Sequence, residues 1–145
     1  MLSITPAGFE SYSKMADTIA TQATSEENRK RLVSCQPKSA KAPDDACATE
    51  FLGHYGLRLF RRPLTAEELR SRVSLARTMA KSSGDFYAGL RYGLATLLQS
   101  PEFLFRKEIA VPVDGKAYAL DPYSRATRLS YLMWDTTPDA ELLKS

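Results

Sequence analysis

Histidine and cysteine are scarce in this chain, whose 145 residues include only His54, Cys35 and Cys47. Three such residues cannot supply four ligands to a zinc ion unless carboxylates or a partner chain complete the set. The two cysteines lie far apart and His54 follows neither of them, so no Cys-x-x-Cys-His motif occurs and covalent haem attachment to this chain is excluded. We therefore expect neither a metal nor a cofactor in this chain.

Long apolar runs and a strong charge of either sign are also missing. No window approaches the roughly 18 consecutive apolar residues of a membrane span. Met1 is followed by Ser3, Thr5 and Pro6, whereas a signal peptide begins with basic residues and an apolar run. The net charge of +3 comes from 20 basic and 17 acidic residues that are interspersed, which is too mild to indicate nucleic-acid binding. We expect no membrane span, no signal peptide in these residues and no nucleic-acid partner.

Catalytic signatures are missing as well. The sequence has no Ser-His-Asp pattern, no paired carboxylates and no phosphate-binding loop. Its candidate acids are better explained as helix caps or surface charges; they are Asp85, Glu102, Asp121 and Asp135. We predict no catalytic residue, and one alternative stays open, namely that the chain is part of an enzyme whose active site needs other segments.

The most apolar stretch that is present runs from Asp85 to Arg106. Large apolar residues recur there every three to four positions: Phe86, Leu90, Leu94, and Leu97 or Leu98. The opposite side is small and apolar, with Gly89 and Gly93 that permit a neighbouring helix to approach closely. Because a helix that is apolar nearly all round is buried, we predict an all-α bundle of about six to seven helices around a central helix, Asp85–Gln99.

Capping patterns predict the remaining helices. The first begins at Thr5-Pro6 and carries an apolar stripe of Phe9, Tyr12, Met15 or Ala16, Ile19 and Ala23. Others are expected from Ser25 to about Val33, from Asp44 or Asp45 to a stop imposed by Pro63, after the capping box Thr65-x-x-Glu68, over 101–106, after Asp121-Pro122, and from Thr137-Pro138-Asp139 onward.

Two segments interrupt the helices. Residues 34–45 are predicted to form an irregular loop bracketed by Cys35 and Cys47, a spacing compatible with a disulfide or with two reduced cysteines. Residues 108–120, with the turn dipeptide Asp114-Gly115, are predicted to form a hairpin or an extended linker. These breaks divide the chain into a helical tail at 1–33, a helical module at 34–107, the linker at 108–120 and the opening helices of a further module at 121–145.

Arg58, Arg61 and Arg62 cluster near the end of one predicted helix, where their charge complements the helix dipole. The alternative function of these three arginines is to dock an anion or a partner. A third hypothesis for the chain as a whole is a cytosolic basic helical binder of nucleic acid or an acidic protein.

Three stretches resemble a known group of proteins: RLFRRPLTAEEL at 58–69, LLQSPEFLFR at 97–106 and LDPYSRATRLSYLMWDTTPDAELL at 120–143. They are similar to the planctomycete- and myxobacterial-type multidomain extracytoplasmic proteins built from domains of unknown function, the families numbered fifteen ninety-five and fifteen ninety-two. The chain looks like an internal fragment of such a protein.

The resemblance implies an extracytoplasmic location, periplasmic or at the cell surface, and a disulfide between Cys35 and Cys47. It implies a c-type cytochrome segment only upstream, in the parent protein. The function it favours is a non-catalytic helical structural or interaction module of a larger exported bacterial protein, with neighbouring modules as partners. Tyr131, Leu132 and Trp134 predict weak self-association through an apolar patch.

Overall fold

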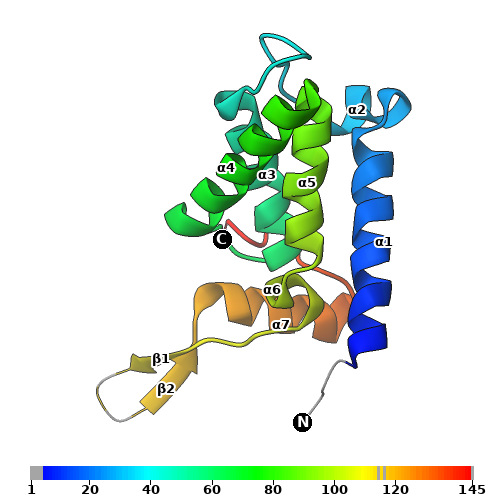
Figure 1. Ribbon diagram of the computed structural model, residues 1–145. Coiled ribbons are helices and arrows are strands. Elements are labelled where there is room, and N and C mark those ends of the chain that lie inside the picture. Colours follow the sequence, from blue (N-terminus) through cyan, green and yellow to red (C-terminus); the bar gives the residue numbers. More distant parts are fainter. Residues whose placement is uncertain (1–4, 114, 116, 145) are drawn as a thin grey trace.

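The computed structural model describes residues 5–113, 115 and 117–144. That part of the chain forms seven helices and one antiparallel hairpin (Figure 1). In order they are α1 (Pro6–Thr24), α2 (Glu26–Leu32), α3 (Asp45–Phe60), α4 (Ala66–Ser83), α5 (Phe86–Leu98), α6 (Pro101–Leu104), β1 (Ala110–Val113), β2 (Ala117–Leu120) and α7 (Pro122–Trp134). The predicted all-α bundle with a short hairpin is confirmed.

Helix α5 is the centre of the bundle, as the sequence predicts. It lies between α4 and α1 and also packs against α3 (Figure 1). Phe86 and Leu90 on α5 and Leu52 on α3 are each exposed by 2% or less. Asp85 caps the helix by accepting a hydrogen bond from the Tyr87 amide at 2.9 Å. The apolar periodicity therefore identified both the helix and its burial.

Two glycines let the neighbouring helices approach α5. A Cβ atom at Gly89 would meet the backbone carbonyl of Ala76 and lie 2.9 Å from the Cβ of Ala80, both on α4. A Cβ at Gly93 would lie 3.0 Å from the Leu52 side chain on α3. The predicted role of both glycines in close helix packing is confirmed.

The predicted stripe of α1 needs correction. The residues of α1 that are buried are small, namely Ala16, Ala20 and Thr24. The large members of the stripe are 44–58% exposed; these are Phe9, Tyr12, Met15 and Ile19. Small side chains let the α1 backbone approach α5 closely, and the helix is therefore rotated away from the orientation that its bulky residues favour.

Two helix ends also differ from the prediction. Helix α3 ends at Phe60, because its C-cap residue Arg61 adopts a left-handed conformation (φ 58°), so the helix stops before Pro63 takes effect. The helix expected from Thr137 onward is limited to hydrogen-bonded turns over 140–144. There Asp139 accepts from the Leu142 amide through its side chain and from the Leu143 amide through its carbonyl. An isolated turn of this kind gains too few hydrogen bonds to propagate a helix.

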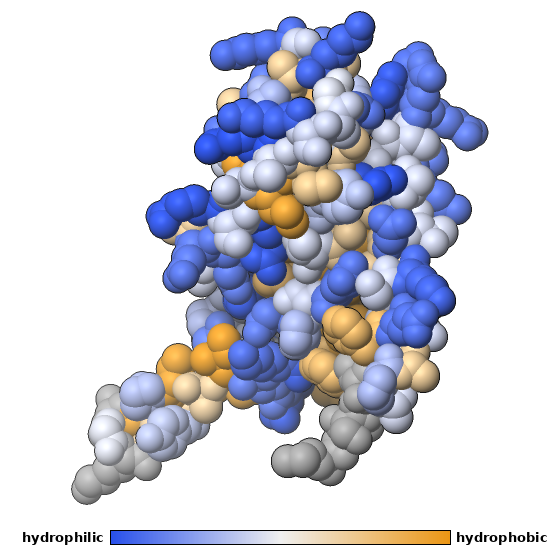
Figure 2. All heavy atoms as spheres, in the orientation of Figure 1, coloured by the Kyte–Doolittle hydropathy of each residue, from blue (hydrophilic) through white to orange (hydrophobic). Residues whose placement is uncertain are grey.

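The linker at 108–120 is a hairpin whose strands pair Ala110 with Leu120 and Val113 with Ala117. Gly115 has a φ of +70°, as a tight turn requires, and Asp114 of the predicted turn dipeptide lies outside the described residues. The hairpin projects from the helical body, and Figure 2 shows hydrophobic atoms near its base. Among its side chains Tyr118 is 77% exposed. The hairpin and α7 add no residue to the buried hydrophobic cluster of the described chain.

Candidate functional site

Arg61 occupies the most unusual position of the arginine cluster. Its left-handed backbone turns the side chain inward, and the residue is only 6% exposed. The guanidinium donates hydrogen bonds to the carbonyls of Glu102 (2.6 Å), Phe105 (3.0 Å) and Phe103 (3.4 Å). These carbonyls belong to the end of α6, so Arg61 supplies the donors that a continuing helix would have supplied. Because Arg61 satisfies these carbonyls in place of further helical amides, α6 ends at Leu104 and not near Arg106 as predicted.

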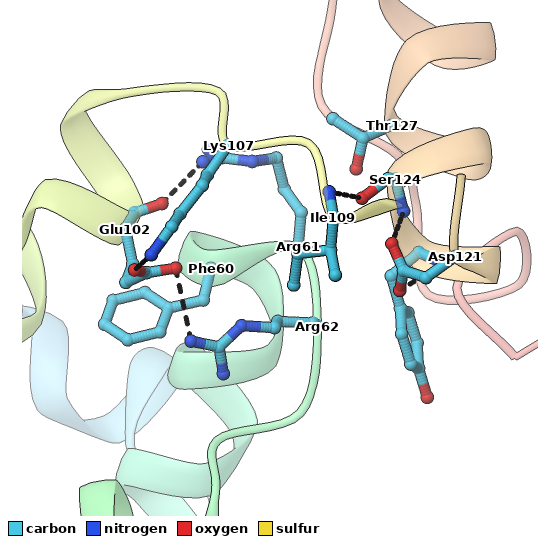
Figure 3. Close-up of a pocket in the computed structure, with 10 residues that line it drawn as sticks. Phe60, Arg61, Arg62, Glu102, Lys107, Ile109, Asp121, Ser124 and Thr127 are labelled. Carbon is cyan, nitrogen blue, oxygen red and sulfur yellow. Dashed lines mark hydrogen bonds and ion pairs between the residues drawn. The ribbon is translucent and has the colours of Figure 1, made fainter. Parts of the chain in front are cut away.

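Arg62 binds two carboxylates. It forms a bidentate pair with Glu68, with both nitrogen to oxygen distances 2.9 Å, and a third contact of 3.2 Å with Glu102. Lys107 donates to the other oxygen of Glu102 at 2.9 Å. Figure 3 shows Arg62 and Lys107 converging on Glu102 from two sides. The four charges connect the α3–α4 turn, α6 and the chain that follows it.

The same contacts shift the pKa values of these groups. The hydrogen bonds from Arg62 hold the pKa of Glu68 at about 2, well below its ordinary value of 4.5. The pKa of Glu102 is also lowered, first by the hydrogen bond from Lys107 and then by Arg62. The pKa of Arg62 is raised, chiefly by its hydrogen bond with Glu68. All three groups are therefore charged over the physiological range, and the network stabilises the folded state.

A second set of contacts attaches α7 to the chain segment that follows Lys107. The Ile109 amide donates to the buried Ser124 hydroxyl at 2.9 Å, and the Asp121 amide donates to the Ile109 carbonyl at 2.9 Å. Between these residues and Arg61 lies a cavity of about 20 Å³, which has room for about one water molecule (Figure 3). We name the whole set the arginine junction, comprising Arg61, Arg62, Glu68, Glu102, Lys107, Ile109, Asp121 and Ser124. Its geometry suits a mechanical connection between segments of the chain.

The predicted docking trio is not one surface cluster. Arg61 is buried and Arg62 is paired with carboxylates, whereas Arg58 has an exposed side chain. Docking of an anion or a partner by these residues stays a prediction, and Arg58 is the member of the trio that it would chiefly involve. The other partners of the junction were not predicted as site residues. Glu68 carried a signal only as part of its capping box, and Glu102 and Asp121 were interpreted as a helix cap or surface charge.

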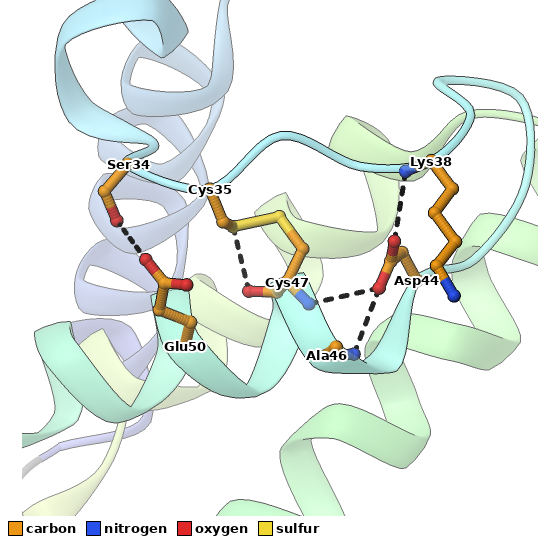
Figure 4. Close-up of a disulfide and its surroundings, with 7 residues drawn as sticks. All are labelled: Ser34, Cys35, Lys38, Asp44, Ala46, Cys47 and Glu50. Carbon is orange, nitrogen blue, oxygen red and sulfur yellow. Dashed lines mark hydrogen bonds between the residues drawn. A yellow bond between two sulfur atoms is a disulfide. The ribbon is translucent and has the colours of Figure 1, made fainter.

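Cys35 and Cys47 form a disulfide, with their Cα atoms 5.4 Å apart. It closes the loop before α3, as Figure 4 shows. Asp44 caps α3 inside this loop by accepting from the Ala46 and Cys47 amides, both at 3.1 Å, and its other oxygen accepts from the Lys38 amide at 3.0 Å. These backbone hydrogen bonds, that from Lys38 foremost, lower the pKa of Asp44. The loop is thus held by a covalent bond and by a carboxylate that binds both of its sides.

The other residues that the sequence offered as candidates for a site have structural roles or lie at the surface. Asp85 and Asp121 are helix caps, and Asp135 ends α7 in a left-handed conformation (φ 51°). His54 is exposed, with its ring edge-on to Tyr55. Within 5–113, 115 and 117–144, no three histidine, cysteine or acidic side chains gather in a way that would hold a metal ion. None of the helices in the same residues is long and apolar enough to cross a membrane.

Family comparisons agree with the resemblance seen in the sequence. Residues 47–108 match the family described as PSD5, protein of unknown function (DUF1595), and residues 120–145 match PSD4, protein of unknown function (DUF1592). The chain therefore contains one segment similar to each of these two families. Arg61, Glu102 and Lys107 of the arginine junction lie in the PSD5 region, whereas Asp121 and Ser124 lie in the PSD4 region. No curated protein and no solved structure matches the chain.

Proposed function

We propose that this chain is a non-catalytic helical module that holds neighbouring parts of a larger exported bacterial protein in a fixed arrangement. The observation that carries the proposal is the arginine junction. Charged side chains are the groups that would suggest a catalytic role. In the junction they bind one another and the backbone carbonyls of α6. Ile109, which directly follows the PSD5 region, donates to Ser124 of the PSD4 region, and Glu108 of the PSD5 region pairs with Arg128 of the PSD4 region.

The test compares Arg61→Ala with Arg58→Ala. Both variants lose one positive charge, but only Arg61 is buried with three carbonyl acceptors. Because three partly buried carbonyls lose their donor, we expect Arg61→Ala to lower the free energy of unfolding by about 1–3 kcal/mol and Arg58→Ala to change it by less than about 0.5 kcal/mol. We also expect hydrogen exchange at residues 103–109 and in α7 to accelerate in Arg61→Ala alone. The proposal is contradicted if the two variants are equally stable and their hydrogen exchange is the same as that of the parent protein.

The extracytoplasmic part of the proposal is supported by the disulfide, because structural disulfides persist in oxidising compartments. Intact mass after alkylation, with and without prior reduction, tests it on protein isolated from its native compartment. We expect two alkyl groups to add only after reduction. Immediate alkylation of both thiols would contradict an exported location.

The partners we propose are the neighbouring modules of the parent protein, including a c-type cytochrome segment upstream. The two family matches support the neighbouring modules, and the cytochrome segment rests on the resemblance of the three sequence stretches alone. Recovery of the complete reading frame tests it directly. A parent sequence with an export signal and a Cys-x-x-Cys-His motif would support the proposal, and one without either would contradict it.

A further inference from the structure

A cleft of about 490 Å³ lies between the segment after α6 and one side of α7. Its walls come from both family regions, and it is distinct from the small cavity inside the arginine junction, although the two share some residues. The lining consists of Arg106, Lys107, Glu108, Ser124, Thr127, Arg128, Tyr131 and Leu132. The volume falls in the range of about 300–1,000 Å³ that is usual for small-molecule sites.

The positive charges in this cleft are not equally available. Arg128 pairs with Glu108 at 3.0 Å, and Lys107 pairs with Glu102 at 2.9 Å. Arg106 has no carboxylate within 4.0 Å among the described residues. The cleft therefore contains one cation whose charge no neighbouring carboxylate balances.

Arg106 is also held in place. The carbon of its guanidinium lies 4.7 Å from the centre of the Tyr131 ring, a cation–π contact. An arginine beside an aromatic ring keeps N–H groups that can form two parallel hydrogen bonds with a carboxylate or a phosphate. Less conformational entropy is lost on binding, because the Arg106 side chain is positioned before a ligand arrives.

We propose that this cleft binds a small organic anion, whose carboxylate or phosphate is held by Arg106. The single unbalanced charge fits one anionic group. Thr127 offers a hydroxyl for the polar body of the ligand, and Leu132 offers an apolar wall. The cleft has room for a ligand body of the size of a hexose or larger.

Titrations followed by backbone amide NMR shifts test the proposal on the full chain, with glucuronate and glucose 1-phosphate as probes and glucose as the neutral control. We expect saturable shifts at residues 106–108 and 124–132, with a dissociation constant on the order of 1 mM for at least one anion. If one anion binds and the other does not, the binding one identifies the head group. Glucose is expected to cause no saturable shift.

Two variants and one control make the test specific. Arg106→Gln removes the charge and Tyr131→Leu removes the aromatic platform, and we expect each to weaken anion binding by about tenfold or more. Arg125→Gln is the matched control, because Arg125 is an exposed arginine of α7 outside the cleft lining. Circular dichroism establishes that each variant is folded. The proposal is overturned if neither anion gives saturable shifts, if glucose binds as well as the anions, or if Arg106→Gln binds no more weakly than Arg125→Gln.

Discussion

The side chain at position 89, a single hydrogen atom, sets the distance between α4 and α5. We expect Gly89→Ala to lower the free energy of unfolding by about 1–3 kcal/mol, because the added methyl group meets the Ala76 carbonyl and the Ala80 Cβ. This cost outweighs the gain of about 1 kcal/mol in helix propensity. Urea unfolding measures the change.

The matched control is Gly53→Ala on α3, because a Cβ at Gly53 has no neighbouring atom within 4 Å. We expect this variant to be as stable as the parent or more stable by up to about 1 kcal/mol. Equal stabilisation by the two substitutions would show that α4 and α5 are not in close contact at Gly89.

Glu68 gives the fold a specific dependence on pH. Its pKa is lowered from 4.5 to about 2 by Arg62, so the folded state prefers the charged carboxylate. Its contribution is therefore fully present above about pH 5 and is lost as the pH falls from about 5 towards 2. Because Glu68 is partly exposed, we expect this contribution to be about 1–2 kcal/mol.

Urea unfolding between pH 7 and pH 3 measures this loss. In Glu68→Gln the capping box is retained but the titrating charge is absent, so the variant should be less stable than the parent at pH 7 and lose less stability on acidification. Glu102 also has a lowered pKa, so some acid sensitivity persists in the variant. An identical pH profile for the parent and Glu68→Gln would contradict this account.

At the scale of elements, the disulfide anchors the loop before α3 to the start of the bundle. The Phe86 amide donates to the Ala40 carbonyl at 2.8 Å, so this loop also contacts the first residue of α5. In the chain-entropy description, a loop closed across twelve positions contributes about 3 kcal/mol. We expect the Cys35→Ala, Cys47→Ala double variant to lose about this amount in urea unfolding and to show faster exchange at the Phe86 amide.

Reduction of the parent protein provides the control for that variant. The reduced parent keeps both cysteine side chains, so a loss of stability equal to that of the double variant assigns the effect to the covalent bond. If the variant loses stability and the reduced parent does not, the effect belongs instead to the packing of Cys47, which is 4% exposed.

Elements were predicted well from the sequence because their signals are local. Caps such as Thr5, Thr65 and Asp85 depend on residues two or three positions away, and they lie where the sequence places them. The apolar stripe of α1 was predicted to face the core, and it is exposed. This prediction was wrong because the orientation of α1 depends on α5, which is distant in the sequence. The buried position of Arg61 was missed for the same reason, since its acceptors lie more than 40 residues away.

At the scale of the whole molecule, the buried hydrophobic cluster and α7 are stabilised by different interactions. The cluster is formed mainly by α1, α3, α4 and α5, with Leu90 and Leu97 fully buried. The buried residues of α7 are polar, Ser124 and Ser130, whereas Leu132 is 79% exposed. Helix α7 is therefore held by hydrogen bonds, an ion pair between Arg128 and Glu108 and its contact with β2, with little apolar burial.

This difference predicts that α7 opens without unfolding of the bundle. We expect native-state hydrogen exchange of amides in α7 to be at least about tenfold faster than in α5, because little apolar surface is exposed when α7 opens. Ser124→Ala removes the acceptor of the Ile109 amide and should accelerate exchange in α7 alone. Leu52→Ala creates a cavity in the core and should accelerate exchange in α5 as well. Equal exchange rates in α7 and α5 of the parent protein would mean that the PSD4 region unfolds together with the bundle.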